Sequence, residues 1–234
     1  PEMRPDEYEM AKTLPLIASA EAQNIHELLK GAFLQRFPAH VELIREGEPP
    51  DFLHIVVDGQ VELFSRYRDR ETTVAVLGAC SSFILAAVVL DKPYLKSARV
   101  LSSTRILMIP SEVIRTIFDN DAGFARALTR ELAEAYRGVL KELKNQKLRS
   151  SLERTAAWLV RFNAEHGTTN QFDLPFDKKV LAGRLGMAPE VLSRTFVTLQ
   201  QYGVRVSGRR IHISDNASLT KLAAPDSLID DPLA

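Results

Sequence analysis

The sequence predicts an α+β chain, with a small antiparallel β-roll first, a long helix next, and a module of helices and one hairpin last. Three observations support this order. Short β-prone runs separated by turn residues occupy residues 41–109. A helical period runs from residue 111 to about residue 148, with no proline between Pro110 and Pro175. Residues 177–203 have the pattern of two helices joined by a tight turn, and a second hairpin pattern follows.

Composition indicates a globular protein. Of 234 residues, 45% are hydrophobic and 26% are charged, which is ordinary for such proteins. The longest apolar run, residues 83–90, is far shorter than the ~18 residues that cross a bilayer. The polar first residues do not form a secretory signal, and the single cysteine excludes an internal disulfide. We therefore expect a cytoplasmic protein without a membrane segment.

Residues 1–110 are predicted to form one N-terminal helix, capped at Ser19, followed by the β-roll. The β-prone runs alternate with turn signals. The Asp58-Gly59 pair is typical of a two-residue hairpin, because a type I′ turn requires positive φ at both central residues. Seven or more short strands at this spacing favour a small antiparallel barrel or roll.

Residues 111–149 are predicted to form a dimerisation helix and a hinge. Apolar side chains recur every three or four residues, close to the seam of a coiled coil; they are Phe124, Leu128, Leu132, Ala135 and Val139. A parallel helix from a second copy would cover this stripe, which predicts a homodimer. The alternative is that the stripe packs on the chain's own roll. The polar residues 145–147 are the predicted hinge.

Residues 150–222 are predicted to be a winged helix-turn-helix. Gly186 ends the first helix of residues 177–203, and Pro189 begins the second. On that second helix Leu192, Phe196 and Leu199 form a stripe for the core. Residues 204–213 alternate apolar and polar side chains around Ser-Gly, as a hairpin does.

A different face of the second helix carries Glu190, Ser193 and Arg194. Arg can bind guanine through O6 and N7, Glu can accept from cytosine N4, and Ser can contact a base or a phosphate. The alternative is an ordinary solvated face with an intrahelical Glu–Arg pair.

The charge distribution favours the first interpretation. Residues 150–222 hold ten basic and six acidic side chains, a net charge of +4, whereas residues 1–149 are close to neutral. We expect phosphate contacts from Lys178 and Lys179 on the first helix and from Arg209 and Arg210 on the hairpin. Residues 223–234 have three acids and no base, and we expect them to form a disordered tail.

With these motifs in this order, the chain resembles the Crp/Fnr superfamily of bacterial transcription regulators from about residue 14 to residue 222. Residues 46–63 look like the family's E-G-E-x-x-x-x-x-Y-I-V-x-x-G-x-V segment, and residues 190–194 are similar to the E-x-x-S-R pattern of the Fnr-like branch. The resemblance implies a cyclic-nucleotide-binding-like β-roll (a double-stranded jelly roll) and a dimeric reader of a TTGAT-type inverted repeat. Glu190, Ser193 and Arg194 would be its base readers. Pro189 departs from the family's usual residue, so the outermost base pair is not specified.

The sensor departs from the family's cyclic-nucleotide readers. Lys96 and Ser97 stand where the resemblance places an Arg-Ser or Arg-Thr pair for the cyclic phosphate, and Ala86 replaces the ribose-binding glutamate. Lysine lacks the guanidinium fork, so we do not expect cyclic AMP to be the signal, although a cyclic-nucleotide-responsive regulator stays an alternative. One cysteine excludes a four-cysteine iron–sulfur cluster.

A haem- or thiol-based sensor of gas or redox state is the other alternative. Its candidate ligands are His26, His40, His54 and Cys80. The apolar residues 83–89 fit either the core or a pocket.

Enzyme motifs such as a phosphate loop or a G-x-S-x-G elbow are absent from the sequence, so we predict no enzymatic activity. The expected partners are double-stranded DNA, a second copy of the chain, and RNA polymerase if the protein is an activator. A further alternative is that the winged module contacts protein instead of DNA.

Overall fold

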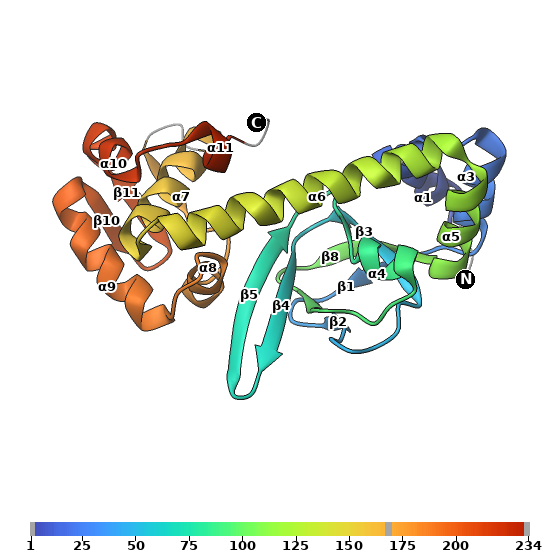
Figure 1. Cartoon of the computed structure of the whole chain (residues 1–234), viewed down its shortest axis with the longest axis horizontal. Coiled ribbons are helices and arrows are strands. Elements are labelled where there is room, and N and C mark those ends of the chain that lie inside the picture. The colour runs from blue at the N-terminus through green and yellow to red at the C-terminus, as the bar shows by residue number, and fades with distance from the viewer. Residues whose placement is uncertain (1–2, 167–169, 232–234) are drawn as a thin grey trace. The chain divides into compact units, whose positions relative to one another are not determined.

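The computed structural model describes residues 3–166 and 170–231. The chain divides into two compact units, residues 1–135 and residues 136–234. The boundary between them falls inside α6 (Ala122–Leu148), the long yellow-green helix of Figure 1. Each unit has its own hydrophobic core.

The N-terminal segment contains three short helices where the sequence predicted one: α1 (Pro5–Lys12), α2 (Pro15–Ala18) and α3 (Ala22–Lys30). Ser19 is not the N-cap of α3. It ends α2, where its Oγ donates to Leu16 O at 2.6 Å, and the N-cap position of α3 is Glu21. Asp121 holds the start of α3 instead, because its Oδ2 accepts from Glu21 N at 2.7 Å.

The roll consists of two antiparallel four-stranded sheets. One has the order β1 (Phe33–Phe37), β8 (Thr104–Pro110), β3 (Phe52–Asp58), β6 (Ser82–Phe83), and the other β2 (Glu42–Ile44), β7 (Ser97–Val100), β4 (Val61–Tyr67), β5 (Arg70–Leu77). Alternate apolar residues of both sheets, such as Val56, Leu63 and Ile106, form the core between them. This is the predicted roll.

The prediction of a hairpin at Asp58-Gly59 is wrong. The flanking strands β3 and β4 belong to different sheets, so the chain turns a corner there. Gly59 is still required: its φ is +92°, and a Cβ would lie 2.8 Å from Thr104 Cα. The local signal identified a residue with positive φ, whereas the pairing of the strands depends on the rest of the roll.

The apolar residues that follow β6 form part of the core. They build α4 (Leu85–Leu90), in which Leu85 and Val88 are buried, while Ala86 is exposed. Ile84 adopts a left-handed conformation with φ of +64° before the helix.

The predicted long helix is divided into α5 (Ser111–Asn120) and α6 by Asp121, whose backbone is extended. Along α6, Phe124 and Leu128 are buried in the first unit, whereas Ala135 and Val139 are exposed. The predicted hinge at residues 145–147 is wrong, because α6 continues through them to Leu148. The helix breaks at Arg149 and Ser150 instead.

The second unit contains the predicted winged helix-turn-helix. Its helices are α7 (Ser151–His166), α8 (Lys178–Arg184), α9 (Pro189–Leu199) and α10 (Asn216–Ala223). A 3₁₀ turn, Gln200–Tyr202, leads from α9 into a three-stranded sheet of order β10 (Val204–Ser207), β11 (Arg210–Ile213), β9 (Gln171–Asp173). The strand β9 was not predicted; it pairs with the hairpin to complete the wing.

The expectation of disorder in residues 223–234 also fails for the part that the structure describes. Ala223 is buried at the end of α10, and α11 (Ser227–Asp230) follows. Charge composition suggested a solvated tail, but Asp230 forms an ion pair with Arg149. Across the described residues, no helix has the length and apolarity to cross a membrane.

Candidate nucleic-acid interface and candidate ligand site

The turn between α8 and α9 has the local geometry that its sequence dictates. Gly186 has φ of +65°, and the N–H of Met187 reaches back to Ala182 O at 3.0 Å, which closes the end of α8. Pro189 is the first residue of α9. Asp177 occupies the N-cap of α8, although its side chain makes no capping hydrogen bond. The turn therefore fixes the direction in which α9 leaves α8.

The face predicted to contact bases is open. Glu190, Ser193 and Arg194 are all exposed, whereas Leu192 and Phe196 on the other side of α9 are buried. Ser193 Oγ donates to Pro189 O at 3.0 Å. The described side chains include no Glu190–Arg194 ion pair, so the alternative of an intrahelical pair is not realised. These three side chains are available to an external partner.

Lys178 and Lys179 lie in the first turn of α8, and both are exposed. Lys178 Nζ lies 5.9 Å from the centre of the Phe196 ring. The ammonium groups of both lysines are exposed at the start of α8, next to the place where α8 packs on α9. This position suits contact with a phosphate backbone.

The wing arginines make contacts within the wing that were not predicted. Arg210 forms a two-point ion pair with Asp173 of β9, at 3.0 and 3.2 Å, and this contact lowers the pKa of the Asp173 carboxyl. Arg209 donates to Leu174 O at 2.7 Å. Both side chains stay exposed while they make these contacts, as does Arg205 on β10. Sequence reasoning missed these contacts because it missed β9.

The two residues predicted to bind a ligand in the roll have different environments. Lys96 is half-buried, and burial lowers the pKa of its ammonium. Ser97 is buried, and its Oγ accepts from Glu46 N at 3.0 Å. The Ser97 hydroxyl therefore already has a structural role in joining β7 to the loop after β2.

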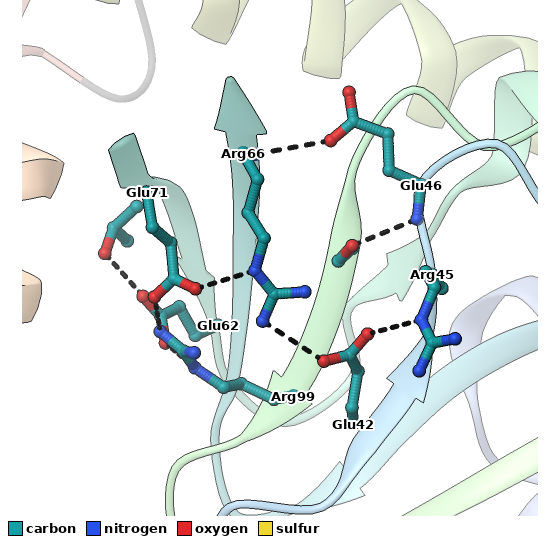
Figure 2. Close-up of polar contacts among 9 residues, drawn as sticks. Glu42, Arg45, Glu46, Glu62, Arg66, Glu71 and Arg99 are labelled. Atoms are coloured by element: carbon teal, nitrogen blue, oxygen red, sulfur yellow. Dashed lines mark hydrogen bonds and ion pairs between the residues drawn. The ribbon is translucent and has the colours of Figure 1, made fainter. Parts of the chain in front are cut away.

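A network of ion pairs beside this contact was not predicted. Glu62 is buried, and it accepts from Thr73 Oγ1 at 2.5 Å and from Arg99 Nε at 2.6 Å. Arg99 Nη2 also donates to Glu71 at 2.7 Å, and Arg66 donates to Glu71 and to Glu42. Figure 2 shows these side chains on neighbouring strands. The alternating charges of residues 62–71 were the available signal.

The four candidate haem or thiol ligands are not gathered at one site. His54 is buried against Phe83, with ring centres 5.2 Å apart, and burial lowers its pKa to about 4. Cys80 is exposed in a loop with φ of +65°. His26 Nδ1 lies 3.3 Å from Tyr8 Oη, and His40 is exposed with positive φ. Within the described ranges, no three His, Cys, Asp or Glu side chains are placed to hold a metal ion.

Two family models match the chain. A cyclic nucleotide-binding domain matches residues 34–121, and a Crp-like helix-turn-helix domain matches residues 153–222. These ranges correspond to the roll with α5 and to the unit that contains α8 and α9.

Named relatives are similar over most of the chain. The transcriptional activator protein anr of Pseudomonas aeruginosa is 27% identical over 186 residues, which cover 77% of this chain and 76% of that protein. A CRP-like cAMP-activated global transcriptional regulator of Mycobacterium tuberculosis is 23% identical over 193 residues, covering 80% of this chain and 86% of that protein. The solved structure of FixK2 from Bradyrhizobium japonicum aligns over 83% of this chain and 98% of the FixK2 chain, with a TM-score of 0.71. At 21% identity, this similarity supports the fold alone.

Proposed function

The chain belongs to the Crp/Fnr superfamily of bacterial transcription regulators, which are not enzymes, and from this premise we propose that it is a sequence-specific DNA-binding homodimer. The observation that carries the proposal is the open face of α9, where Glu190, Ser193 and Arg194 are exposed together. Two such faces, one per copy, would enter successive major grooves about one helical turn apart.

The proposed target is an inverted repeat of TTGAT type. Arg194 would fork onto a guanine and Glu190 would accept from a cytosine, the contacts that guanidinium and carboxylate groups make in the major groove. Lys178 and Lys179 would bind phosphates in register with them. Arg209 and Arg210, whose side chains are 57% and 63% exposed, would add phosphate contacts from the wing. RNA polymerase would be a further partner if the protein is an activator, and its place of action would be the cytoplasm.

The proposed signal is not cyclic AMP. Ala86 is exposed where an acidic partner for a ribose would be required, and Lys96 supplies a single point charge with a lowered pKa. The single cysteine of the sequence cannot hold a four-cysteine iron–sulfur cluster.

Substitution of Arg194 by Ala tests the proposed readout. Losing one guanidinium fork per half-site should weaken binding by about 1–3 kcal/mol at each half-site. Fluorescence anisotropy would compare a duplex of TTGAT and ATCAA half-sites, four base pairs apart, with a scrambled duplex. We expect the variant to lose most of its preference for the repeat and to keep the wild-type oligomeric state.

The matched control is Arg68→Ala, which removes one exposed arginine at the turn between β4 and β5. It should preserve the preference for the repeat. If Arg194→Ala also preserves that preference, α9 does not read the bases and the proposal fails. Adding cyclic AMP in a parallel titration should leave the affinity unchanged, and strict dependence on the nucleotide would overturn the proposed signal.

A further inference from the structure

The segment after α10 returns to the junction between α6 and α7. Arg149 lies at this junction, and its side chain is only 8% exposed. Its Nη1 and Nη2 donate to the two carboxylate oxygens of Asp230 at 2.8 and 2.6 Å. Nη2 also donates to Ala224 O at 3.1 Å. One guanidinium thus holds both ends of residues 224–230 against the helix break.

The segment is attached a second time, two turns earlier on α6. Lys141 Nζ donates to Asp231 O at 2.6 Å. The segment is also ordered by its own contacts, since Asp226 Oδ1 accepts from Leu228 N and Asp230 Oδ2 accepts from Asp226 N, both at 2.8 Å. These bonds orient the Asp230 carboxylate toward Arg149, so less conformational freedom is lost when the ion pair forms.

The other side of the junction is held from within the winged unit. Arg154 of α7 is buried and donates to Arg149 O at 2.6 Å and to Leu185 O at 2.8 Å. Arg184 of α8 forms an ion pair with Glu142 of α6 at 3.2 Å. The last two turns of α6 are therefore fastened to the helix-turn-helix on one face and to residues 224–231 on another.

We propose that residues 224–231 are a strap that fixes the angle between α6 and α7, and that opening the strap lowers the affinity of the protein for its DNA site. The second part rests on the proposed function. A junction that is already rigid needs no further ordering when two recognition helices engage one duplex, whereas a loosened junction must be ordered at the expense of binding free energy.

Asp230→Asn tests the strap because it keeps the size of the side chain and removes its charge. Glu165→Gln is the matched control; it removes one exposed negative charge from the end of α7. Hydrogen exchange, followed by mass spectrometry on the full chain, would report peptides that span residues 143–156. We expect exchange in Asp230→Asn to be faster by about tenfold or more, the factor that about 1.4 kcal/mol produces, and unchanged in the control.

Two further comparisons make the test decisive. In an Arg149→Met background, Asp230→Asn should have no additional effect on exchange, because the Arg149 guanidinium is already absent and the Asn amide oxygen can still accept from Asp226 N. Affinity for the TTGAT-type duplex should fall several-fold in Asp230→Asn and stay constant in Glu165→Gln. Equal exchange in the two single variants overturns the strap. Faster exchange with unchanged affinity overturns its link to DNA binding. A wild-type protein that prefers no repeat would overturn the proposed function, while the exchange result would still decide on the strap.

Discussion

His54 is a neutral histidine inside the roll. Only 4% of it is exposed, its ring stacks on Phe83, and its Nδ1 has no hydrogen-bond partner among the described residues. Burial lowers the pKa from 6.5 to about 4, against a weaker opposing effect of the Phe52 backbone. The folded state therefore binds fewer protons than the unfolded state between these two pH values.

The sign of this linkage predicts that stability decreases as pH falls. Above pH 6.5 His54 is neutral in both states, so it adds no pH dependence. From pH 6.5 down to about 4 the unfolded state takes up the proton first, and the free energy of unfolding should decrease by about 1.4 kcal/mol per pH unit, in total about 3 kcal/mol. Urea denaturation of the wild type and of His54→Leu would measure it. In His54→Leu the free energy of unfolding should depend less on pH between 6.5 and about 4. If the wild type and the variant show the same pH dependence, another group is responsible.

At the scale of the element, one arginine, Arg99, joins several acidic side chains on the sheet β2-β7-β4-β5. Arg99 pairs with the buried carboxylate of Glu62 and with Glu71 (Figure 2). Its guanidinium carbon lies 4.1 Å from the centre of the Phe64 ring. Removing a cation from a buried carboxylate costs about 3–5 kcal/mol. Because Arg99 is itself 23% exposed, we expect Arg99→Ala to lower the free energy of unfolding by about 2–3 kcal/mol, measured by chemical denaturation.

A double mutant distinguishes two effects of removing Arg99: the loss of its attraction to Glu62, and the cost of leaving the buried Glu62 carboxylate without a partner. Glu62→Gln with Arg99→Met leaves no buried ion without a partner and keeps apolar contact with Phe64. It should be more stable than Arg99→Ala alone, as replacement of a whole buried pair usually is. A double mutant that is less stable than the single variant would show that the attraction itself stabilises the sheet. The exposed pair Lys12–Glu9 offers a comparison in which truncation should change stability by less than 1 kcal/mol.

The elements that the sequence predicted correctly are those with local signals. Gly186 and Pro189 define the turn between α8 and α9 by backbone conformation alone, and the stripe of α9 follows from its period. The errors arose where distant residues decide. Asp58-Gly59 forms a corner because β3 pairs with β8, and residues 145–147 stay helical where α6 is fastened to α8.

The candidate site shows the same division. The exposure of Glu190, Ser193 and Arg194 follows from the period of one helix, so it could be predicted from the sequence alone. The ion pair of Arg210 and the hydrogen bond that Ser97 Oγ accepts were not predicted, because their partners Asp173 and Glu46 are 37 and 51 residues away in the chain. Such contacts leave no periodic pattern in a single sequence.

At the scale of the whole molecule, the proposed dimer depends on the part of α6 that neither core covers. Tyr136 and Val139 are each 64% exposed, Leu143 is 47% exposed and Leu140 41%. They continue the apolar stripe that begins with the buried residues Phe124 and Leu128. One sequence period therefore serves two purposes: its first turns pack on the roll, and its later turns present an apolar surface of the kind that associates in pairs of helices.

Val139→Glu tests this proposal for the whole molecule. Burying a valine contributes about 1.5–3 kcal/mol, and a symmetric dimer would lose that contribution twice and gain two facing carboxylates. Sedimentation should show a dimer for the wild type and a monomer for the variant, with affinity for the TTGAT repeat reduced to that for one half-site. Leu95→Glu, at an 85% exposed position in the roll, is the control and should stay dimeric. A dimeric Val139→Glu protein would place the interface elsewhere and leave the exposed turns of α6 without the role proposed for them.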